Sequence, residues 1–415
     1  MIPQATRFSA GPLNGRIRVP GDKSISHRAL ILSALSPSPI EVRNLNPGRD
    51  VEATRLALAA LGAGNGTALH DAAETIDCMN SGSTARMILG VCAGAGVRAR
   101  LDGDDSLRRR PMEPVAAQLR AFGARIETSD GKLPATVQGN AGAQTTRFIL
   151  LSPSAQVKSA LLFAGVFGNV PISIAGDRGS RDHTERLLRY FGSDIDFDRA
   201  TVELRSAPVT FRDVDVAGDF SAAAFFIVAA TIAPGSSLVI ENAGVNPSRT
   251  GLLDALLAMG ADIRLENERE VSGEPVADIA VRSAGLRGVA IGPDVAVRAI
   301  DEIPVLAVAA AFARGETKIT GVADLRNKES DRVAAIERLL RAAGIDVESL
   351  PNGIAIKGGT PSCDGETIAT HGDHRTAMAA AVLAAGAGPV GIDDESSIAV
   401  SFPSFLEQLR AVQAS

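Results

Sequence analysis

The sequence predicts an α/β protein (α+β in the sense of mixed sheets) with two domains, each made of three copies of one repeat around a pseudo-threefold axis. Two observations carry this prediction. The chain has 415 residues, and at about 100–200 residues per domain that length accommodates two domains with real cores. A strand, a polar turn, an apolar helix, another strand and an amphipathic helix also recur six times. A unit that cannot bury its own helix must pack against other copies.

The first helix of each repeat is predicted to lie in the core. It follows a polar turn, is rich in Ala and Gly, and is apolar nearly all round, as in GDKSISHRALILSAL and NSGSTARMILGVCAG. A helix that is hydrophobic on every side is a buried helix. The six turn-and-helix segments span residues 21–35, 80–94, 154–168, 218–232, 300–314 and 372–386.

The second helix of each repeat is predicted to have one buried face and one wet face. Its apolar residues recur at i, i+3, i+4 and i+7, the spacing of an amphipathic helix. Five of the six segments end in Gly just past the last apolar position, which is a helix stop signal. These segments span residues 51–63, 111–124, 182–193, 248–261, 329–344 and 401–412.

The break between the domains is expected before the fourth repeat. We predict one domain of repeats one to three over residues 14–217, and a second of repeats four to six over 1–13 plus 218–415. The strand RIRVPGD is expected to feed the first repeat. The chain then crosses between the domains near 14–20 and near 217, and the two crossings form a predicted hinge pair.

Composition excludes several classes of protein. A hydrophobic content of 45% is too high for a disordered chain, and a net charge of −6 with one Tyr and no Trp argues against a nucleic-acid surface. The cysteines (Cys78, Cys92 and Cys363) lie far apart, so neither a disulfide framework nor a structural zinc site is expected. The N-terminal segment lacks the pattern of a secretory signal. We therefore expect a cytoplasmic protein.

One uncharged segment is long enough to span a bilayer. Residues 220–240 carry no charge over 21 positions. The sequence Pro-Gly-Ser-Ser at 234–237 divides the segment into a helix-like half and a strand-like half. We therefore predict a buried helix, a turn and a strand, and no membrane span.

The polar turns carry the candidate functional residues. Ser, Asn and Asp there are explained in part by helix capping, but Lys23 and Arg28 oppose the helix dipole. Cations at a helix N-terminus indicate a bound anion, and basic turns gathered in a cleft suit a small polyanionic substrate. A metal site at His371 and His374 is not expected, because no third ligand lies near in the sequence. The other candidates are Ser24, Ser26, Asn80, Ser81, Ser83, Arg86, Ser154, Gln156, Asp219, Ser221, Asp301, Glu302, Asp373 and Arg375.

Nine motifs in order resemble those of the 5-enolpyruvylshikimate-3-phosphate synthase family. They are PGDKSISHR, NSGSTAR, RRRPM, SAQVKSALLFAG, SRDHTERLL, IDEIPVLAVAAA, LRNKESDR, GDHRTAMA and SFPSFLEQL, and they cover nearly the whole chain. The resemblance implies the two-domain enolpyruvyl transferase fold, with three βαβαββ repeats per domain closing over the substrates. It implies transfer of the enolpyruvyl group of phosphoenolpyruvate to the 5-hydroxyl of shikimate 3-phosphate.

The resemblance also implies which residues hold the substrates. For shikimate 3-phosphate they would be Lys23, Ser24, Arg28, Ser154, Ala155, Gln156, Arg181, Asp301 and Lys328. For phosphoenolpyruvate they would be Lys23, Gly82, Arg110, Gln156, Arg332 and Arg375. Glu329 stands where the family has its catalytic glutamate, Asp301 suits a base toward the hydroxyl, and Lys23 and Glu329 suit proton carriers. No metal and no cofactor are expected, and we expect a monomer with no nucleic-acid or membrane partner.

Some positions depart from the best-studied branch of that family. Met87 stands where that branch has Pro, and Val400 stands where it has Lys. Ala155 replaces a Ser, and Asn327 stands where a hydrophobic residue is usual. The chain is therefore more similar to the second branch, which contains members that tolerate the inhibitor glyphosate.

Two other functions remain open at this point. A related enolpyruvyl transferase acts on UDP-N-acetylglucosamine, but that enzyme is expected to have Lys-Asn where this chain has Lys23-Ser24, and a cysteine in the loop near Arg110. A non-catalytic protein that binds phosphate ligands on the same scaffold is the second alternative. An assay of phosphate released from phosphoenolpyruvate and shikimate 3-phosphate separates all three functions.

Overall fold

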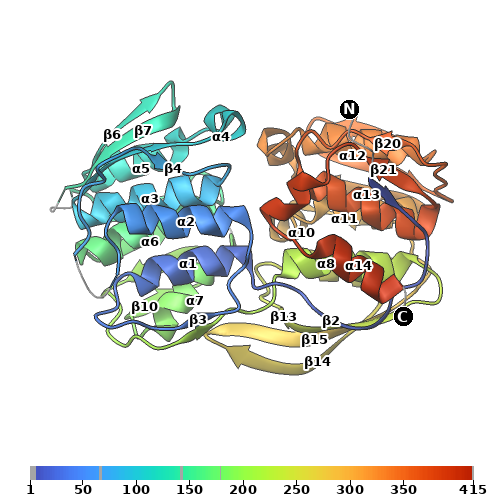
Figure 1. The fold of residues 1–415 in the computed structure, drawn as a ribbon, viewed down its shortest axis with the longest axis horizontal. Helices are drawn as coiled ribbons and strands as arrows, with labels where there is room; N and C mark the ends of the chain where they lie inside the picture. Colours follow the sequence, from blue (N-terminus) through green and yellow to red (C-terminus); the bar gives the residue numbers. More distant parts are fainter. Residues whose placement is uncertain (1–5, 65–67, 141–143, 178, 414–415) are drawn as a thin grey trace. The chain divides into compact units, whose positions relative to one another are not determined.

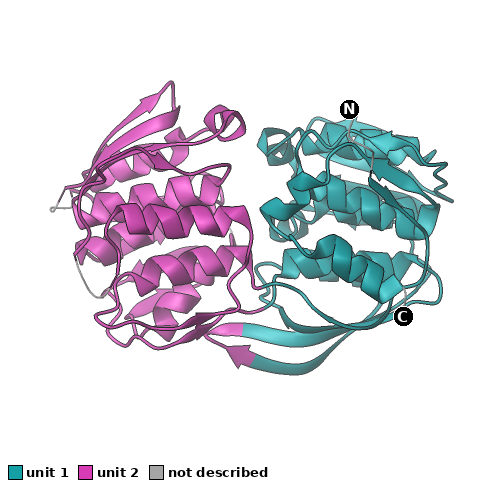
Figure 2. Cartoon of the chain, in the orientation of Figure 1, with its two compact units in different colours: residues 1–20, 218–269, 275–415 teal, residues 21–217, 270–274 magenta. Residues whose placement is uncertain are grey.

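The chain folds into two compact units. The computed structural model describes residues 6–64, 68–140, 144–177 and 179–413. Unit 1 contains the chain up to Pro20, Gly218–Arg269 and the chain from Pro275 onward, and unit 2 contains Gly21–Ala217 and Glu270–Glu274 (Figure 2). That these units act as separate domains joined by a hinge pair stays a prediction.

Unit 2 contains the first three helix pairs (Figure 1). The predicted core helices are α1 (Lys23–Ser33), α3 (Gly82–Ala95) and α6 (Ala155–Gly168). The amphipathic helices are α2 (Arg49–Ala60), α5 (Glu113–Phe122) and α7 (His183–Tyr190), with the short helix α4 (Asp105–Arg109) before α5. A Cβ on Gly90 would lie 2.2 Å from the carbonyl oxygen of Ala160. The small residues therefore let the backbones of α3 and α6 pack closely.

Unit 1 contains the other three helix pairs. Its core helices α8 (Phe220–Ile232), α11 (Ile303–Ala311) and α13 (His374–Ala387) all contact one another, and every residue of α8 is buried. The amphipathic helices are α9 (Gly251–Met259), α12 (Arg332–Ala342) and α14 (Phe405–Gln413). The shorter helices are α10 (Pro293–Arg298), η1 (Ala323–Asn327) and η2 (Ser396–Val400).

Two sheets of each unit have four strands in the same order. In unit 2 they are β4 (Ile76–Asp77), β5 (Arg98–Asp102), β7 (Lys132–Gln138) and β6 (Arg125–Ser129), and β8 (Arg147–Ile149), β9 (Ile172–Ala175), β11 (Thr201–Leu204) and β10 (Ile195–Phe197). In unit 1 they are β2 (Asn14–Arg18), β13 (Ser237–Gly244), β15 (Glu274–Arg282) and β14 (Asp262–Val271), and β16 (Ala290–Ile291), β17 (Gly315–Thr320), β19 (Gly353–Gly358) and β18 (Asp346–Leu350).

The remaining repeats have smaller sheets. In unit 2, β12 (Val214–Asp215) pairs in parallel with β3 (Val42–Arg43). In unit 1, β21 (Val390–Ile392) lies between β1 (Thr6–Phe8) and β20 (Thr367–Ile368). The predicted architecture of six repeats, three in each unit, is confirmed.

The strand expected to feed the first repeat belongs to the fourth. In β2, Arg16 pairs with Val239 of β13, so residues 14–20 lie in unit 1, and the sequence-based boundary at residue 14 is wrong for this segment. The first repeat takes β12 instead, from just before the second crossing. The last strand before each crossing therefore stays in the unit that the chain is leaving: β2 in unit 1 and β12 in unit 2. A strand pairs with a free sheet edge whose register matches its own. The order of the elements along the chain does not determine which edge that is.

A third crossing was not predicted. The turn of the hairpin β14–β15 belongs to unit 2, where the Ser272 hydroxyl accepts a hydrogen bond from the backbone N–H of Asp215 at 2.9 Å. The uncharged segment at 220–240 forms α8 and the start of β13, as predicted. None of the helices in the part of the chain described above is long and apolar enough to span a membrane.

Candidate functional site

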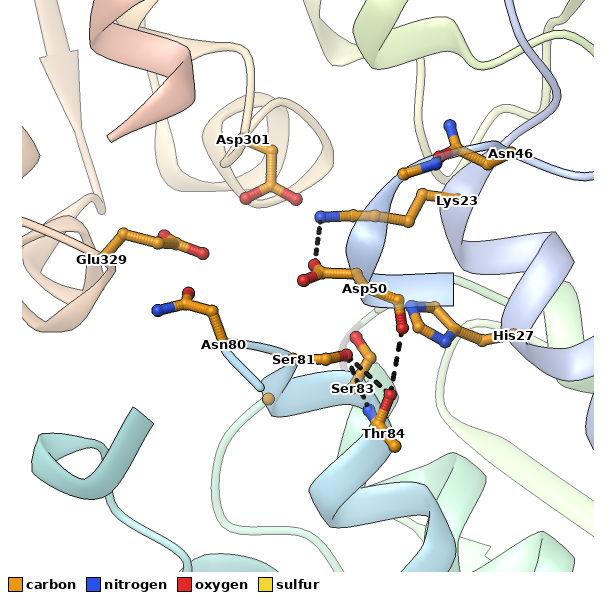
Figure 3. Close-up of polar contacts among 12 residues, drawn as sticks. Lys23, His27, Asn46, Asp50, Asn80, Ser81, Ser83, Thr84, Asp301 and Glu329 are labelled. Atoms are coloured by element: carbon orange, nitrogen blue, oxygen red, sulfur yellow. Dashed lines mark hydrogen bonds and ion pairs between the residues drawn. The ribbon is translucent and has the colours of Figure 1, made fainter. Parts of the chain in front are cut away.

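Three of the predicted residues of unit 2, Lys23, Gly82 and Ala155, are the first residues of helices α1, α3 and α6. Asp22 caps α1 by accepting a hydrogen bond from the N–H of Ile25, and Lys23 is the first residue of that helix. The Lys23 ammonium forms an ion pair with Asp50 Oδ2 at 2.9 Å (Figure 3), and both side chains are mostly buried. Asp50 is the second residue of α2 and was not predicted from the sequence. This carboxylate holds the Lys23 side chain in place.

Arg28 is a buried cation whose hydrogen bonds all go to neutral oxygens. It donates to the hydroxyls of Thr184 and Ser159 and to the backbone carbonyl of Ser24, each at 2.7 Å. Burial lowers the pKa of this guanidinium to about 10, and the nearby carboxylate of Glu185 offsets only part of the effect. Among the residues that the structure describes, none forms an ion pair with Arg28. A bound anion would stabilise its charge.

The turn that contains Gly82 is organised by two arginines. Arg86 Nη1 donates to Gln156 Oε1 at 2.7 Å, and Gln156 Nε2 donates to the Ser83 hydroxyl at 3.0 Å. Arg110 Nη2 donates to Asn80 Oδ1 at 2.5 Å. These contacts connect the first turn of α3 to that of α6 and to the segment after α4.

Arg181 lies in a loop that a buried ion triad fixes. Lys158 of α6 contacts Asp177 and Glu185, both at 2.6 Å, and all three side chains are at most 2% exposed. Burial lowers the pKa of Lys158, but the two carboxylates outweigh it and hold that pKa above its ordinary value. Lys158 also lies 3.4 Å from the carbonyl of Ser180. The triad thus holds the chain on both sides of Arg181.

The predicted residues of unit 1 surround Arg332, the first residue of α12. Its guanidinium contacts Glu329 at 2.6 Å, Asp373 at 2.9 Å and Asp301 at 3.4 Å, and its side chain is 1% exposed. Burial lowers the pKa of Arg332, but the three carboxylates outweigh it and raise that pKa above its ordinary value. Arg332 therefore gathers the two predicted proton carriers of this unit, Asp301 and Glu329, around one cation.

Arg375 and Lys328 complete this cluster. Arg375 donates to the backbone carbonyl of Asp301 at 2.9 Å and lies 3.8 Å from its carboxylate, and Lys328 lies 3.7 Å from the same carboxylate. Behind them, Ser221 donates a short hydrogen bond to the buried Glu302. Within the described ranges, no group of three His, Cys, Asp or Glu side chains is arranged to hold a metal ion.

The comparisons with known proteins cover almost the entire chain. A family model described as EPSP synthase (3-phosphoshikimate 1-carboxyvinyltransferase) matches residues 9–409. The chain belongs to the EPSP synthase family. A relative from Anaeromyxobacter sp. (strain Fw109-5), named 3-phosphoshikimate 1-carboxyvinyltransferase, is 46% identical and covers 96% of each chain. A relative of the same name from Thermus thermophilus is 44% identical, with 96% of each chain covered.

Solved structures show the same family and fold. An EPSP synthase from Acinetobacter baumannii has a TM-score of 0.85 at 36% identity and covers 99% of this chain and 98% of its own. The enolpyruvyl transferase NikO from Streptomyces tendae has a TM-score of 0.76 at 17% identity, with 98% and 97% covered, and so shows the fold alone. The sequence-based predictions of the family, the enolpyruvyl transferase fold and a transferase are confirmed.

In this member of the EPSP synthase family, the motif residues of unit 2 form one cluster and those of unit 1 form another. The unit 2 cluster comprises Lys23, Ser24, Arg28, Gly82, Arg110, Ser154, Ala155, Gln156 and Arg181; the unit 1 cluster comprises Asp301, Lys328, Glu329, Arg332 and Arg375. Of the arginines at 108–110, only Arg110 was predicted as a ligand, and its neighbour Arg108 forms an exposed ion pair with Asp102. Sequence reasoning missed Asp50, Thr54 and the Lys158 triad, which are ordinary polar residues in helices and loops until the fold brings them together.

His27 predicts an acid-sensitive stability. Burial lowers its pKa far below the ordinary value, and the nearby charges of Lys23 and Arg28 lower that pKa further. Below about pH 6.5 the unfolded chain binds a proton at His27 that the folded chain does not bind. The free energy of unfolding therefore decreases as the pH is lowered. Between pH 7.5 and 5.5 the loss from this group is about 1.4 kcal/mol. Urea denaturation of wild type and His27→Asn at both values measures it; equal losses in the two proteins contradict the prediction.

Proposed function

We propose that this protein transfers the enolpyruvyl group of phosphoenolpyruvate to the 5-hydroxyl of shikimate 3-phosphate and releases phosphate, as a step of aromatic amino-acid biosynthesis. Membership of the EPSP synthase family supports this assignment. The observation that carries it is Arg28, a buried cation without a carboxylate partner among the described residues, at the helix end that presents Lys23. Such a site is built for a phosphorylated ligand.

We assign the binding of shikimate 3-phosphate mainly to unit 2. Lys23, Ser24 and Arg28 of α1 and Arg181 of the fixed loop supply positive charge and hydroxyl contacts. Ser154 caps α6, whose first turn adds Ala155 and Gln156 and presents backbone N–H groups to an anion. Asp301 and Lys328 contact the shikimate ring.

We assign the binding of phosphoenolpyruvate to both clusters. In unit 2 the ligands are Lys23, Gly82, Arg110 and Gln156, and in unit 1 they are Arg332 and Arg375. Three carboxylates already surround Arg332: Nη2 contacts Glu329 at 2.6 Å and Nε contacts Asp373 at 2.9 Å, whereas Nη1 lies 3.4 Å from Asp301. The Nη1 edge is therefore where a substrate carboxylate would compete for the guanidinium.

The reaction needs three proton transfers, one at the 5-hydroxyl oxygen and two at C3 of phosphoenolpyruvate. Asp301 takes the proton from the 5-hydroxyl of shikimate 3-phosphate while the hydroxyl oxygen bonds to C2 of phosphoenolpyruvate. Lys23 or Glu329 protonates C3, which becomes a methyl group. The C2–O bond to phosphate then breaks in the tetrahedral intermediate, and Lys23 or Glu329, whichever gave its proton to C3, takes a proton back from the methyl group as the C2–C3 double bond re-forms. The arginines hold the charges of the phosphate and carboxylate throughout. These steps require no metal and no cofactor, and we propose that the enzyme acts as a cytoplasmic monomer.

A phosphate-release assay tests the proposal. We expect phosphate from phosphoenolpyruvate only when shikimate 3-phosphate is present. Release with UDP-N-acetylglucosamine as acceptor would support the related transferase instead. Binding of shikimate 3-phosphate in calorimetry without any release would support a non-catalytic protein.

A methyl group at Gly82 is predicted to hinder the inhibitor glyphosate more than phosphoenolpyruvate, because the inhibitor is longer and would meet the added Cβ first. A Cβ there would lie 2.7 Å from Arg86 Nη1 and 3.5 Å from Arg110 Nη1, so Arg86 must shift, and its bond to Gln156 changes with it. We expect wild type to be inhibited by glyphosate in competition with phosphoenolpyruvate. Gly82→Ala should weaken that inhibition by at least about tenfold, or about 1.4 kcal/mol, and raise the KM for phosphoenolpyruvate much less. Equal inhibition constants in the two proteins would show that Gly82 does not border the inhibitor.

A further inference from the structure

His27 is a buried histidine for which the proposed mechanism has no use. Its side chain is fully buried, and Nδ1 lies 2.7 Å from the hydroxyl of Thr54. Its Nε2 atom has no hydrogen-bond partner in the described part of the chain. An apolar side chain would fill this position without the cost of burying a polar ring. The contribution of His27 is therefore directional, through Nδ1.

The His27–Thr54 contact lies one helical turn below the Lys23–Asp50 ion pair. His27 follows Lys23 by four residues in α1, and Thr54 follows Asp50 by four residues in α2. Residues four apart lie on the same face of a helix, one above the other. Two polar contacts at successive turns therefore join α1 to α2, and together they oppose rotation or sliding of one helix against the other.

The same hydrogen-bonded chain continues to the third helix. The Thr54 hydroxyl lies 2.7 Å from that of Thr84 in α3. The Thr84 hydroxyl in turn lies 2.7 Å from the Ser81 hydroxyl and 3.2 Å from the backbone carbonyl of Asp50 (Figure 3). Ser81 caps α3, accepting from the N–H of Thr84, and Gly82 is the next residue. The chain thus ends at the turn assigned to phosphoenolpyruvate.

The imidazole of His27 makes its hydrogen bond to Thr54 as a neutral group. Burial keeps the pKa of His27 far below neutral pH, and the charges of Lys23 and Arg28 act in the same direction. A neutral ring adds no positive charge to a site that already holds Lys23 and Arg28. It also keeps one hydrogen-bond partner at Nδ1 across the pH range in which an enzyme works.

We propose that a hydrogen-bonded chain of four side chains positions Lys23 and the Gly82 turn relative to each other. This chain, called the relay below, consists of His27, Thr54, Thr84 and Ser81. None of the relay's side chains outside that turn needs to touch substrate; His27 and Thr54 are positioning residues. The inference rests on the proposed function, because it assigns the relay to the geometry of that reaction. It extends the site by one layer of residues beneath Lys23 and Gly82.

Two matched pairs of variants test the relay. His27→Leu and Thr54→Val remove the hydrogen bonds while nearly keeping the volume, whereas His27→Asn and Thr54→Ser keep a polar atom at the bonding position. Small displacements at a site cost large factors in rate, so we expect the first two to lower kcat by about tenfold and to raise the KM for phosphoenolpyruvate by about fivefold. The KM for shikimate 3-phosphate should change less, by about twofold, because Arg28, Arg181 and the first turn of α6 hold it in addition to Lys23. The second two should stay near wild type.

A buried threonine outside the relay provides the stability control. Thr231 in α8 is 1% exposed, and its hydroxyl donates a hydrogen bond to the carbonyl of Ile227 at 2.7 Å. Thr231→Val should change Tm as much as Thr54→Val does and leave kcat unchanged. The combined variant His27→Leu/Thr54→Val should be no slower than either single variant, because residues of one network are not additive.

Each outcome decides between the relay and its alternatives. Full kcat in Thr54→Val, or equal losses in Thr54→Ser and Thr54→Val, would overturn the relay, as would a loss of kcat in Thr231→Val of the same size. If His27→Leu does not fold, the Thr54 pair decides alone. Wild-type turnover of phosphoenolpyruvate and shikimate 3-phosphate is measured in the same series; its absence would refute the proposed function, whereas normal wild-type turnover with full activity in Thr54→Val would refute only the relay.

Discussion

Lys23→Met is expected to lower kcat by about a thousandfold, the largest effect on activity of any single change in unit 2. Lys23 is assigned to both substrates and to proton transfer, and methionine keeps much of its length without its charge. Lys23 is the first residue of α1, and its side chain remains 18% exposed beside Asp50, so its removal creates no core cavity. We expect Tm to change by only a few degrees.

Initial rates of phosphate release at saturating substrates, together with thermal unfolding, measure both effects. Lys132→Met is the matched control, because Lys132 is an exposed lysine on β7 of the same unit. It should have wild-type rates. Turnover by Lys23→Met above about a tenth of wild type would refute the catalytic assignment, since loss of a proton-transfer group typically costs at least about a hundredfold.

Arg332→Met is expected to cause the largest loss of stability. It removes the cation from between Asp301, Glu329 and Asp373, of which Asp373 is fully buried. Breaking a buried ion pair by removing one partner costs about 3–5 kcal/mol, because the other charge is left without compensation. Burial raises the pKa of Asp373, and Arg332 outweighs it to hold that pKa below its ordinary value. Without Arg332 the carboxyl should therefore take up a proton at a higher pH.

Urea denaturation of three variants separates this effect from general damage to α12. Arg341→Met removes an arginine of the same helix that is 60% exposed and paired with Glu337, and it should cost less than about 1 kcal/mol. Arg332→Met/Asp373→Asn should recover part of the loss, because it removes the uncompensated charge. A loss in Arg332→Met no greater than in Arg341→Met would show that the cluster is not held by its buried cation.

The sign of the pH dependence follows from the lowered pKa of Asp373. A carboxyl with a lowered folded-state pKa adds stability above its unfolded pKa, near 3.9, and that stability is lost as pH falls through the folded value. In Arg332→Met this contribution is absent, so the variant should lose less stability than wild type between pH 5 and the acid limit. A parallel acid limb in both proteins would contradict the assignment of the pKa shift to Arg332.

The sequence by itself determined the repeat and the identity of its helices. Residues 220–232 carry no charge and no wet face, so no arrangement other than full burial suits α8. The glycine after α9, Gly260, has a φ of 97°, and the stop that it predicted in the sequence is where the helix ends. The cations at the start of α1 likewise pointed to an anion before any geometry was known. Periodicity, caps and charge near a helix end are local properties, and local sequence is sufficient to predict them.

Only the tertiary structure decided which strands complete which repeat and which side chains meet. The strand at 14–18 was expected in the first repeat and pairs instead with β13, more than two hundred residues along the chain. Asp50 and Thr54 carry no functional signal in the sequence, yet one holds Lys23 and the other joins His27 to Thr84. Arg332 was expected from the sequence to bind a substrate, but the sequence did not predict that the fold surrounds it with three carboxylates. Strand pairing and side-chain contact depend on packing between segments distant in sequence, and no local pattern contains that information.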